Sequence, residues 1–370
     1  MKAYRAESES KYRQTIDLLC AAAIKGLVDC YSEKDLSDRG RSFNGREVRL
    51  NMASHLRYII IAQIGIKRWL LSCDCNTQLP DFWEHIESRS NEIDNAGDLG
   101  LAIWAGVESD ADDARILAER LAEKWTQMRR ACNAVELAWV VQGMTCLSQR
   151  HSMTDEMNSV LKDAHDRLID LYCQDTRLLA RHNRKGAGGF VSRHIACFAD
   201  QVYPILALAS YGQAFDDGES IEAAVAVADT MCLLQGNEGQ WWWHYDVKTG
   251  TVVEEYPVFS VHQDGMAPMA LLAIDRVAGT DHSSFIEKGM MWLNRSNELN
   301  AAMVLHEQGV IWRDIHRREI GKMYRLIRGL LFTAGLAKAH RLSGKNVFGY
   351  VVNRECRPYH LGWILYAWAH

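Results

Sequence analysis

Residues 233–270 read LLQGNEGQWWWHYDVKTGTVVEEYPVFSVHQDGMAPMA and combine aromatic, acidic and turn-forming residues in one stretch. Three tryptophans, Trp241, Trp242 and Trp243, stand side by side. Neighbouring side chains diverge on a helix and alternate across a strand, so neither element buries three adjacent indoles on one face. Gly250 marks a turn further along. We therefore expect an irregular segment or a short hairpin between helices, and such a connection is where a site is sought first.

Helical periodicity dominates the rest of the chain. Apolar side chains recur at steps of three and four residues, which is typical of amphipathic helices. The segments with this pattern are 7–31, 50–72, 81 onward, 98–104, 114–128, 134–147, 155–172, 199–211, 220–234, 265–278, 285–292, 320–342 and 358–369. Strand signals are confined to 251–253 and 347–352.

Roughly a dozen helices starting at intervals of roughly 20–30 residues indicate repeated helical hairpins. Such hairpins stack as an open superhelix or close as a ring. The polar and aromatic segments of the second half fall between helices, which favours a ring with loops at one end. We predict an all-α fold, an (α/α)6 toroid of antiparallel helices with little or no strand. It forms a single domain over 1–370, with halves that meet near 181–196.

Composition excludes several classes of function. The net charge of −5 gives no electrostatic footprint for nucleic acid. The longest apolar run, 58–62, is far shorter than the roughly 20 residues of a membrane span, which leaves only peripheral membrane contact open. The 10 cysteines lie mostly in helical patterns, and the polar amino terminus lacks a secretory signal, so we expect a cytoplasmic protein. Cys73 and Cys75 form a close pair without a second pair, and no structural zinc is expected there.

The form Q-x3-G-x-W, at Gln235, Gly239 and Trp241, resembles the QW motif of squalene and oxidosqualene cyclases. More loosely, it is similar to the repeats of the terpenoid cyclase and protein prenyltransferase superfamily. This resemblance implies an (α/α)6 toroid in which the glutamine caps a helix end and the tryptophan packs against it. A purely structural role for the motif is the alternative.

Three further segments bear on the same resemblance. The segment 262–266, HQDGM, is similar to the zinc segment of prenyltransferase β subunits, and 358–361, PYHL, is similar to their Tyr-His segment. Met266 stands at the cysteine position, and a thioether does not replace thiolate for zinc, so a zinc site is doubtful. Asp110-Ala111-Asp112-Asp113 matches the D-x-D-D acid of class II terpene cyclases, but acidic residues are also favoured at a helix start.

Asp264 is the leading candidate for chemistry, because a carboxyl in an aromatic setting beside His262 is suited to proton transfer. A helix cap is the alternative for Asp264. Tyr256 precedes a proline, which extends the backbone and is expected to aim the ring inward. Glu355 is expected to form a carboxylate pair with Asp264, or a simple ion pair with Arg357.

The candidates for substrate binding are aromatic and basic residues, because aromatic faces stack on ligands and guanidinium groups hold carboxylates or phosphates. They are Trp242, Trp243, Trp312, Arg313, Arg317, Arg318, Arg357, Tyr359 and His360. A solvated basic turn is the alternative for the arginines of 313–318.

Three functions remain open. The first is a toroidal enzyme that acts on an isoprenoid diphosphate by acid-initiated carbocation chemistry, with Mg²⁺ if the substrate is a diphosphate and no other cofactor expected. The second is a carbohydrate-active toroid, a hydrolase, lyase or epimerase acting on an acidic saccharide. The third is a helical scaffold without catalysis, which predicts that the Arg, His and Glu clusters lie scattered on the outer surface. The resemblance favours the first, with a small-molecule substrate in either enzymatic case.

Overall fold

A computed structural model describes most of the chain. Its described backbone comprises residues 2–31, 38–43, 47–52, 56–72, 79–183, 193–318 and 349–369. The cysteine pair at 73 and 75, the helix expected at 320–342 and most of the loop expected to separate two halves lie outside these ranges.

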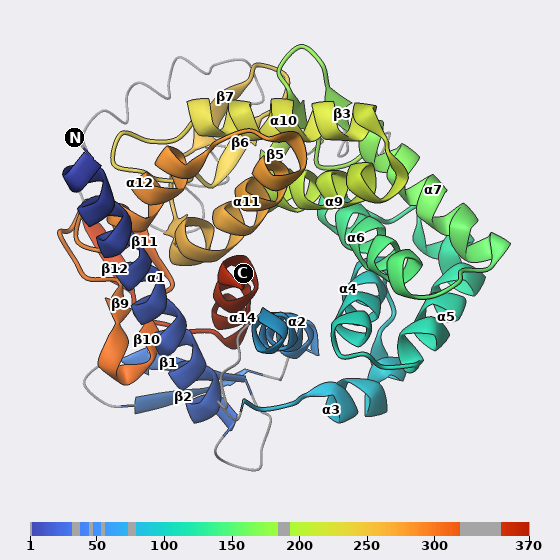
Figure 1. Cartoon of the computed structure of the whole chain (residues 1–370), viewed down its shortest axis with the longest axis horizontal. Helices are drawn as coiled ribbons and strands as arrows, with labels where there is room; N and C mark the ends of the chain where they lie inside the picture. Colours follow the sequence, from blue (N-terminus) through green and yellow to red (C-terminus); the bar gives the residue numbers. More distant parts are fainter. Residues whose placement is uncertain are drawn as a thin grey trace.

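Six helices form a closed inner ring in the described part of the chain (Figure 1). They are α2 (Leu56–Ser72), α4 (Ala96–Glu108), α6 (Ala134–Arg150), α9 (Ala199–Phe215), α11 (Ala267–Ala278) and α14 (Pro358–Trp368). Each contacts the next along the chain, and the last, α14, packs against the first, α2. The first and last inner helices therefore close the ring.

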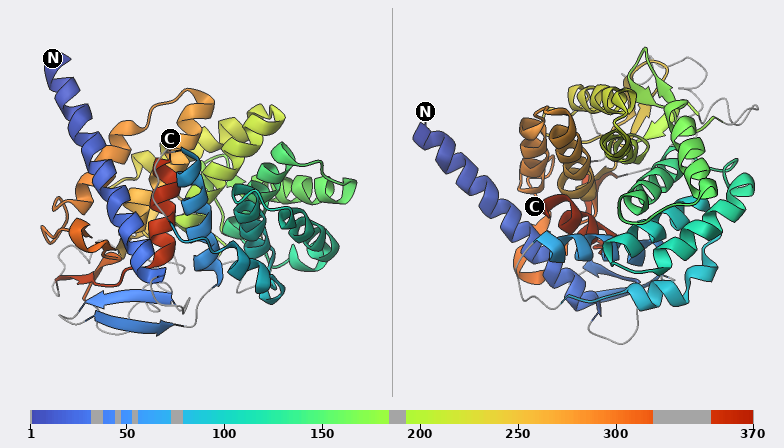
Figure 2. Two further views of the ribbon diagram at one scale, coloured as in Figure 1. Left: turned by 60° about the horizontal axis from the view of Figure 1, so that its bottom comes forward. Right: turned by 45° about the vertical axis from the view of Figure 1, so that its right-hand side comes forward.

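A second set of helices lies outside the ring. They are α1 (Lys2–Tyr31), α3 (Trp83–Ser88), α5 (Asp113–Met128), α7 (Asp155–Ile169), α10 (Gly218–Leu233) and α12 (Ser283–Leu293). Helix α5 packs on α4, α7 on α6, α10 on α9 and α1 on α14. Figure 2 shows α14 between α1 and α2. The twelve helices of the described ranges confirm the predicted toroid.

Local sequence signals start several of these helices. Asn133 and Glu136 form a reciprocal capping box at the start of α6, which satisfies two backbone N–H groups that the helix itself leaves unpaired. Side chains of Asn95, Thr154 and Asp217 accept the same kind of bond at the starts of α4, α7 and α10. These caps fix where the hairpins turn and so help to set the length of each helix.

Glycines let neighbouring inner helices approach closely. A Cβ on Gly65 of α2 would lie 1.9 Å from the carbonyl oxygen of Gly362 on α14. A Cβ on Gly143 of α6 would lie 2.2 Å from the carbonyl oxygen of Gly100 on α4. Only glycine, without a Cβ, permits such backbone contact.

Aromatic side chains fill the centre of the ring. Trp104 lies 5.6 Å from Trp363, measured between ring centroids, and Trp363 lies 5.7 Å from Tyr203. Trp139 continues the series at 5.2 Å from Tyr203. The centre is therefore a packed core in this region rather than an open channel.

The strands are short and connect the helices. They are β1 (Asp38–Phe43), β2 (Glu47–Met52), β3 (Tyr172–Cys173), β4 (Leu178–Leu179), β5 (Ile195–Cys197), β6 (His244–Asp246), β7 (Thr251–Glu254), β8 (Val258–Phe259), β9 (Val304–Leu305), β10 (Val310–Ile311), β11 (Asp314–Arg317) and β12 (Tyr350–Asn353). The antiparallel sheets pair in the orders β5-β6-β7 and β12-β11-β8, and the other strands form three two-stranded hairpins. No helix within the described ranges is both long and apolar enough to cross a membrane.

The stretch 233–270 forms the predicted hairpin, and a π-helical turn, His262–Met266, then leads into α11. Gly250 turns the hairpin with φ of 67°. Trp241 is buried, whereas Trp242 and Trp243 are half-buried. The side-chain amide of Gln235 donates to the carbonyl oxygen of Phe285, at 2.9 Å. This contact ties the end of α10 to α12 and is structural.

Candidate functional site

The first two turns of five inner helices, α2, α4, α6, α9 and α14, lie at one end of the ring, which we call the amino-terminal rim. Its residues are Arg57 and Tyr58 of α2, Asp98 of α4, Trp139 of α6, Asp200 and Tyr203 of α9, and Tyr359 and His360 of α14, together with the adjoining residues Trp243, Phe259, Arg313, Glu355 and Arg357. Direct contacts link these helices: Arg57 bonds Asp98 and lies over Trp139, and Tyr58 packs on Tyr359 at 4.6 Å. The amino ends of helices carry partial positive charge, so the rim favours an anion.

Two arginines share one carboxylate at the rim. Arg313 Nη1 and Arg357 Nη2 donate to the same oxygen of Glu355, at 2.7 and 2.9 Å. Burial raises the pKa of Glu355, but the two guanidinium groups outweigh it and hold the pKa below its ordinary value. Glu355 is therefore ionised, and a second carboxylate, that of Asp314, lies 3.9 Å from Nε of Arg313.

Each of three rim arginines also lies over an aromatic ring. Arg57 lies 5.2 Å from the centroid of Trp139, and Arg313 lies 5.5 Å from that of Phe259. Arg357 lies 5.8 Å from the ring of Tyr58 and donates to its hydroxyl at 3.0 Å. Cation–π contact and ion pairing together restrain the guanidinium groups.

Asp264 and His360 form a buried pair. His360 Nε2 lies 2.7 Å from Asp264 Oδ1, and Asp264 is 0% exposed. Its other oxygen, Oδ2, is buried without a hydrogen-bond partner. Burial raises the pKa of Asp264 against the opposing effect of His360. Asp264 is fully enclosed, and its side chain contacts the imidazole of His360.

His262 lies beside this pair in an aromatic setting. Its ring stacks on Phe198 with centroids 4.2 Å apart and lies parallel to Trp243 at 6.1 Å. Burial lowers the pKa of His262 to about 3, so the ring is neutral. His262 therefore adds no charge to the neighbouring Asp264.

Asp200 is a site residue that the sequence analysis missed. It lies in the first turn of α9, is 2% exposed, and accepts from the backbone N–H of Cys197 at 2.8 Å. Burial raises its pKa. An aspartate inside the apolar run 198–209, FADQVYPILALA, is the signal that identifies it.

Several predicted residues lie away from the Asp264–His360 pair, in a separate cluster. The hydroxyl of Tyr256 donates to Glu298 at 2.6 Å, so it is not aimed at Asp264. Arg317 pairs with Glu255 and lies 5.0 Å from the ring of Tyr256. Trp242 packs on the same tyrosine at 5.9 Å.

The remaining predicted residues divide by burial. Trp312 is buried, whereas Arg318 is exposed. The expected carboxylate pair of Glu355 and Asp264 is not seen, because Glu355 binds the two rim arginines and Asp264 binds His360. Glu355 fits the alternative of an ion pair with Arg357.

Metal ligands are not grouped in the described part of the chain. No cluster there contains three or more His, Cys, Asp or Glu side chains placed to hold an ion. Asp110 and Asp112 are exposed, and Asp113 starts α5. They lie past the carboxyl end of α4, about 20 Å from the rim at 1.5 Å per residue. Asp112 makes no side-chain capping bond.

Comparisons with known proteins concern the fold. No family model matches the chain. No curated protein matches it either. A solved structure described as a possible member of the GH105 family from Salmonella enterica serovar Paratyphi A matches with a TM-score of 0.60 and 10% identity, over 95% of this chain and 92% of that one.

Two further structures match over similar lengths. An unsaturated glucuronyl hydrolase specific for heparin gives a TM-score of 0.57 at 11% identity, covering 95% of this chain and 96% of its own. A glycosyl hydrolase family 88 protein from Bacteroides vulgatus gives 0.55 at 12% identity, covering 96% and 97%. At such identity the likeness shows a shared fold.

These comparisons correct the first functional interpretation. The isoprenoid enzyme is wrong, because the solved structures that share this toroid are described as carbohydrate-active proteins. The likeness to terpenoid cyclases, prenyltransferases and their QW motif is likewise not supported, and Gln235 makes the structural contact with Phe285 described above. The findings agree with the alternative, a carbohydrate-active α/α toroid.

Proposed function

We propose that the protein is an enzyme that acts on an acidic saccharide at the amino-terminal rim. The observation that carries this proposal is the stacking of three rim arginines on aromatic rings, where anion-binding groups and flat apolar faces alternate. A uronic acid unit needs both, because it has a carboxylate at one edge and C–H groups on its ring faces. The solved toroid described above as an unsaturated glucuronyl hydrolase supports the same substrate class.

The carboxylate of the substrate binds near Glu355. Arg313 and Arg357 both contact that single carboxylate, so two guanidinium groups stand side by side where the carboxylate of a substrate would bind. Bidentate bonds from guanidinium to carboxylate give both attraction and orientation. The amino ends of α2 and α14 add to the positive potential.

Two aspartates with raised pKa serve proton transfer, Asp200 directly and Asp264 through His360. Burial raises the pKa of Asp200 at the start of α9, which favours the protonated form that a general acid needs to protonate a glycosidic oxygen. Asp264 holds the imidazole of His360 through Nε2, which leaves Nδ1 at the opposite edge of the ring for a substrate. Asp264 is thus a positioning residue and His360 its reacting partner.

The test is incubation of the purified protein with acidic and neutral oligosaccharides, followed by mass spectrometry. Cleavage of acidic but not neutral chains is expected. If the summed mass of the products exceeds that of the substrate by one water, the reaction is hydrolysis. If the summed mass equals that of the substrate, the reaction is elimination. A single product of unchanged mass and altered chromatographic retention identifies epimerisation. We expect Asp200→Asn to lower turnover by roughly 10²-fold or more. No reaction with any acidic oligosaccharide would overturn the proposal.

A matched control separates charge from general damage at the rim. Arg357→Lys keeps the positive charge but loses the paired geometry, so KM for the acidic substrate is expected to rise with little change in kcat. Arg115→Lys, on the exposed face of α5 in a pair with Glu119, should leave both constants unchanged.

A further inference from the structure

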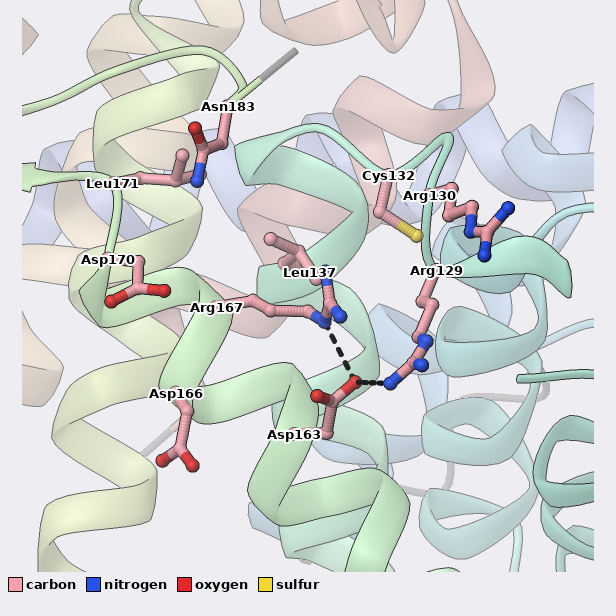
Figure 3. Close-up of a pocket in the computed structure, with 10 residues that line it drawn as sticks. All are labelled: Arg129, Arg130, Cys132, Leu137, Asp163, Asp166, Arg167, Asp170, Leu171 and Asn183. Atoms are coloured by element: carbon pink, nitrogen blue, oxygen red, sulfur yellow. Dashed lines mark hydrogen bonds and ion pairs between the residues drawn. The ribbon is translucent and has the colours of Figure 1, made fainter. Parts of the chain in front are cut away.

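A polar pocket of about 370 Å³ lies outside the ring, beside the rim (Figure 3). It opens between the carboxyl ends of α5 and α7 and the beginning of α6. Its lining residues are Arg129, Arg130, Cys132, Leu137, Asp163, Asp166, Arg167, Asp170, Leu171 and Asn183. The volume falls at the lower end of the roughly 300–1,000 Å³ of small-molecule sites.

One wall of the pocket is basic. Arg129 Nη1 and Arg167 Nε donate to the same oxygen of Asp163, at 3.2 and 2.8 Å. The indole N–H of Trp125 donates to that oxygen as well, at 2.7 Å. Two guanidinium groups therefore share one carboxylate, and Arg130 has no ion-pair partner among the described residues. This wall has positive charge and N–H donors to offer a ligand.

The opposite wall and the floor have different chemistry. Asp166 and Asp170 project from the last turns of α7 and are exposed. Their carboxylates are acceptors, which suit hydroxyl groups. Leu137 and Leu171 are 4% and 5% exposed and give the floor an apolar surface.

We propose that this pocket binds one uronate unit of an acidic saccharide, as a subsite distant from the rim. The carboxylate binds Arg129 and Arg130, the hydroxyl groups donate to Asp166 and Asp170, and a C–H face of the sugar lies on Leu137. This proposal rests on the function proposed above, because the same polymer supplies both sites.

The position of α6 connects the two sites. Trp139 and Leu137 are two residues apart, so they lie on nearly opposite faces of α6, one toward the rim and one toward the pocket. A chain of several sugar units that leaves the rim needs only to cross the amino end of this helix, whose diameter is about 10 Å.

The experiment uses methyl NMR of the full chain with sodium glucuronate and glucose as probes. Glucuronate is expected to shift the methyl signals of Leu137 and Leu171, and glucose at the same concentration is not. The double variant Arg129→Ala/Arg130→Ala should weaken this binding by about tenfold or more. Arg115→Ala, elsewhere on α5, should leave it unchanged, and so should the rim variant Arg357→Ala.

Failure of this proposal is distinguishable from failure of the proposed function. The proposed pocket site is wrong if the leucine signals do not respond to glucuronate, or if they respond equally in the double variant. This holds even where acidic oligosaccharides are turned over at the rim. Leucine shifts that are lost in the double variant support the pocket even where no turnover is found. Selective loss of affinity for longer oligosaccharides in the double variant supports its role as a distant subsite.

Discussion

Closure of the ring depends on the contact between α2 and α14, and Gly65→Ala tests it directly. The new Cβ would lie 1.9 Å from the carbonyl oxygen of Gly362, 2.6 Å from its carbonyl carbon and 2.8 Å from its Cα. All three are backbone atoms, so no side chain can rotate away. Cβ atoms essentially never approach within 3.0 Å, so the two helices must separate by at least 1.1 Å, the difference between 3.0 and 1.9 Å.

Two opposing effects set the size of the loss. Alanine gains about 1 kcal/mol over glycine in a helix interior. Forcing extra volume into a packed contact costs roughly 3 kcal/mol when backbone has to move. We therefore expect the free energy of unfolding to fall by about 2 kcal/mol or more. The same separation displaces Tyr58 from Tyr359, whose ring centroids lie 4.6 Å apart across this contact, and we expect a 1 Å misplacement at the rim to lower turnover by about 10²-fold.

Urea unfolding, followed by tryptophan fluorescence and circular dichroism, measures the effect. Gly218→Ala is the matched control, because a Cβ there meets nothing within 4 Å at the start of α10. That variant is expected to be neutral or up to about 1 kcal/mol more stable. Equal unfolding midpoints for Gly65→Ala and Gly218→Ala would refute direct contact between the first and last inner helices.

Three other predictions concern the rim and the motif. Asp264→Asn should lower saccharide turnover by about 10²-fold while the circular dichroism spectrum persists, and unchanged turnover removes this carboxyl from the mechanism. Because the pKa of Glu355 is lowered in the folded state, its ion pairs with Arg313 and Arg357 stabilise the protein above its ordinary pKa of 4.5 and are lost as pH falls through the lowered value. Glu355→Gln should therefore flatten the acid side of the curve of unfolding free energy against pH, and a curve that keeps its slope would contradict this. Gln235→Ala should cost about 1 kcal/mol of unfolding free energy without changing KM, and an altered KM would show a role in substrate binding instead.

The fold was predictable because its signals are local. Apolar residues at steps of three and four define a helix within any short window, so most of the helices could be predicted from the sequence alone. Ring closure follows from hairpins of similar length that bury one face each. Sequence periodicity does not predict the close approach of Gly65 to Gly362. These residues are remote along the chain and meet only because the last inner helix packs against the first.

The site was predictable only where chemistry was concentrated in a short segment. Arg313, Glu355 and His360 stand in conspicuous polar clusters, and the structure places them at the rim. Arg57 and Asp200 stand alone in apolar helices and look like ordinary first-turn residues. Their significance comes from the ring, which brings the first turns of separate helices together.

The resemblance at Gln235 was misleading because toroids with different reactions need the same hydrogen bonds between neighbouring hairpins. Each hairpin leaves backbone groups unpaired at its turn, and a glutamine that reaches the next hairpin satisfies them. The amide of Gln235 meets the carbonyl of Phe285 for this reason, and Trp241 is buried against α12 beside Gly289. A motif whose residues stabilise the fold indicates the fold and not the reaction. The chemistry has to be inferred from groups outside this motif, such as the guanidinium groups that Arg313 and Arg357 bring to one carboxylate at the rim.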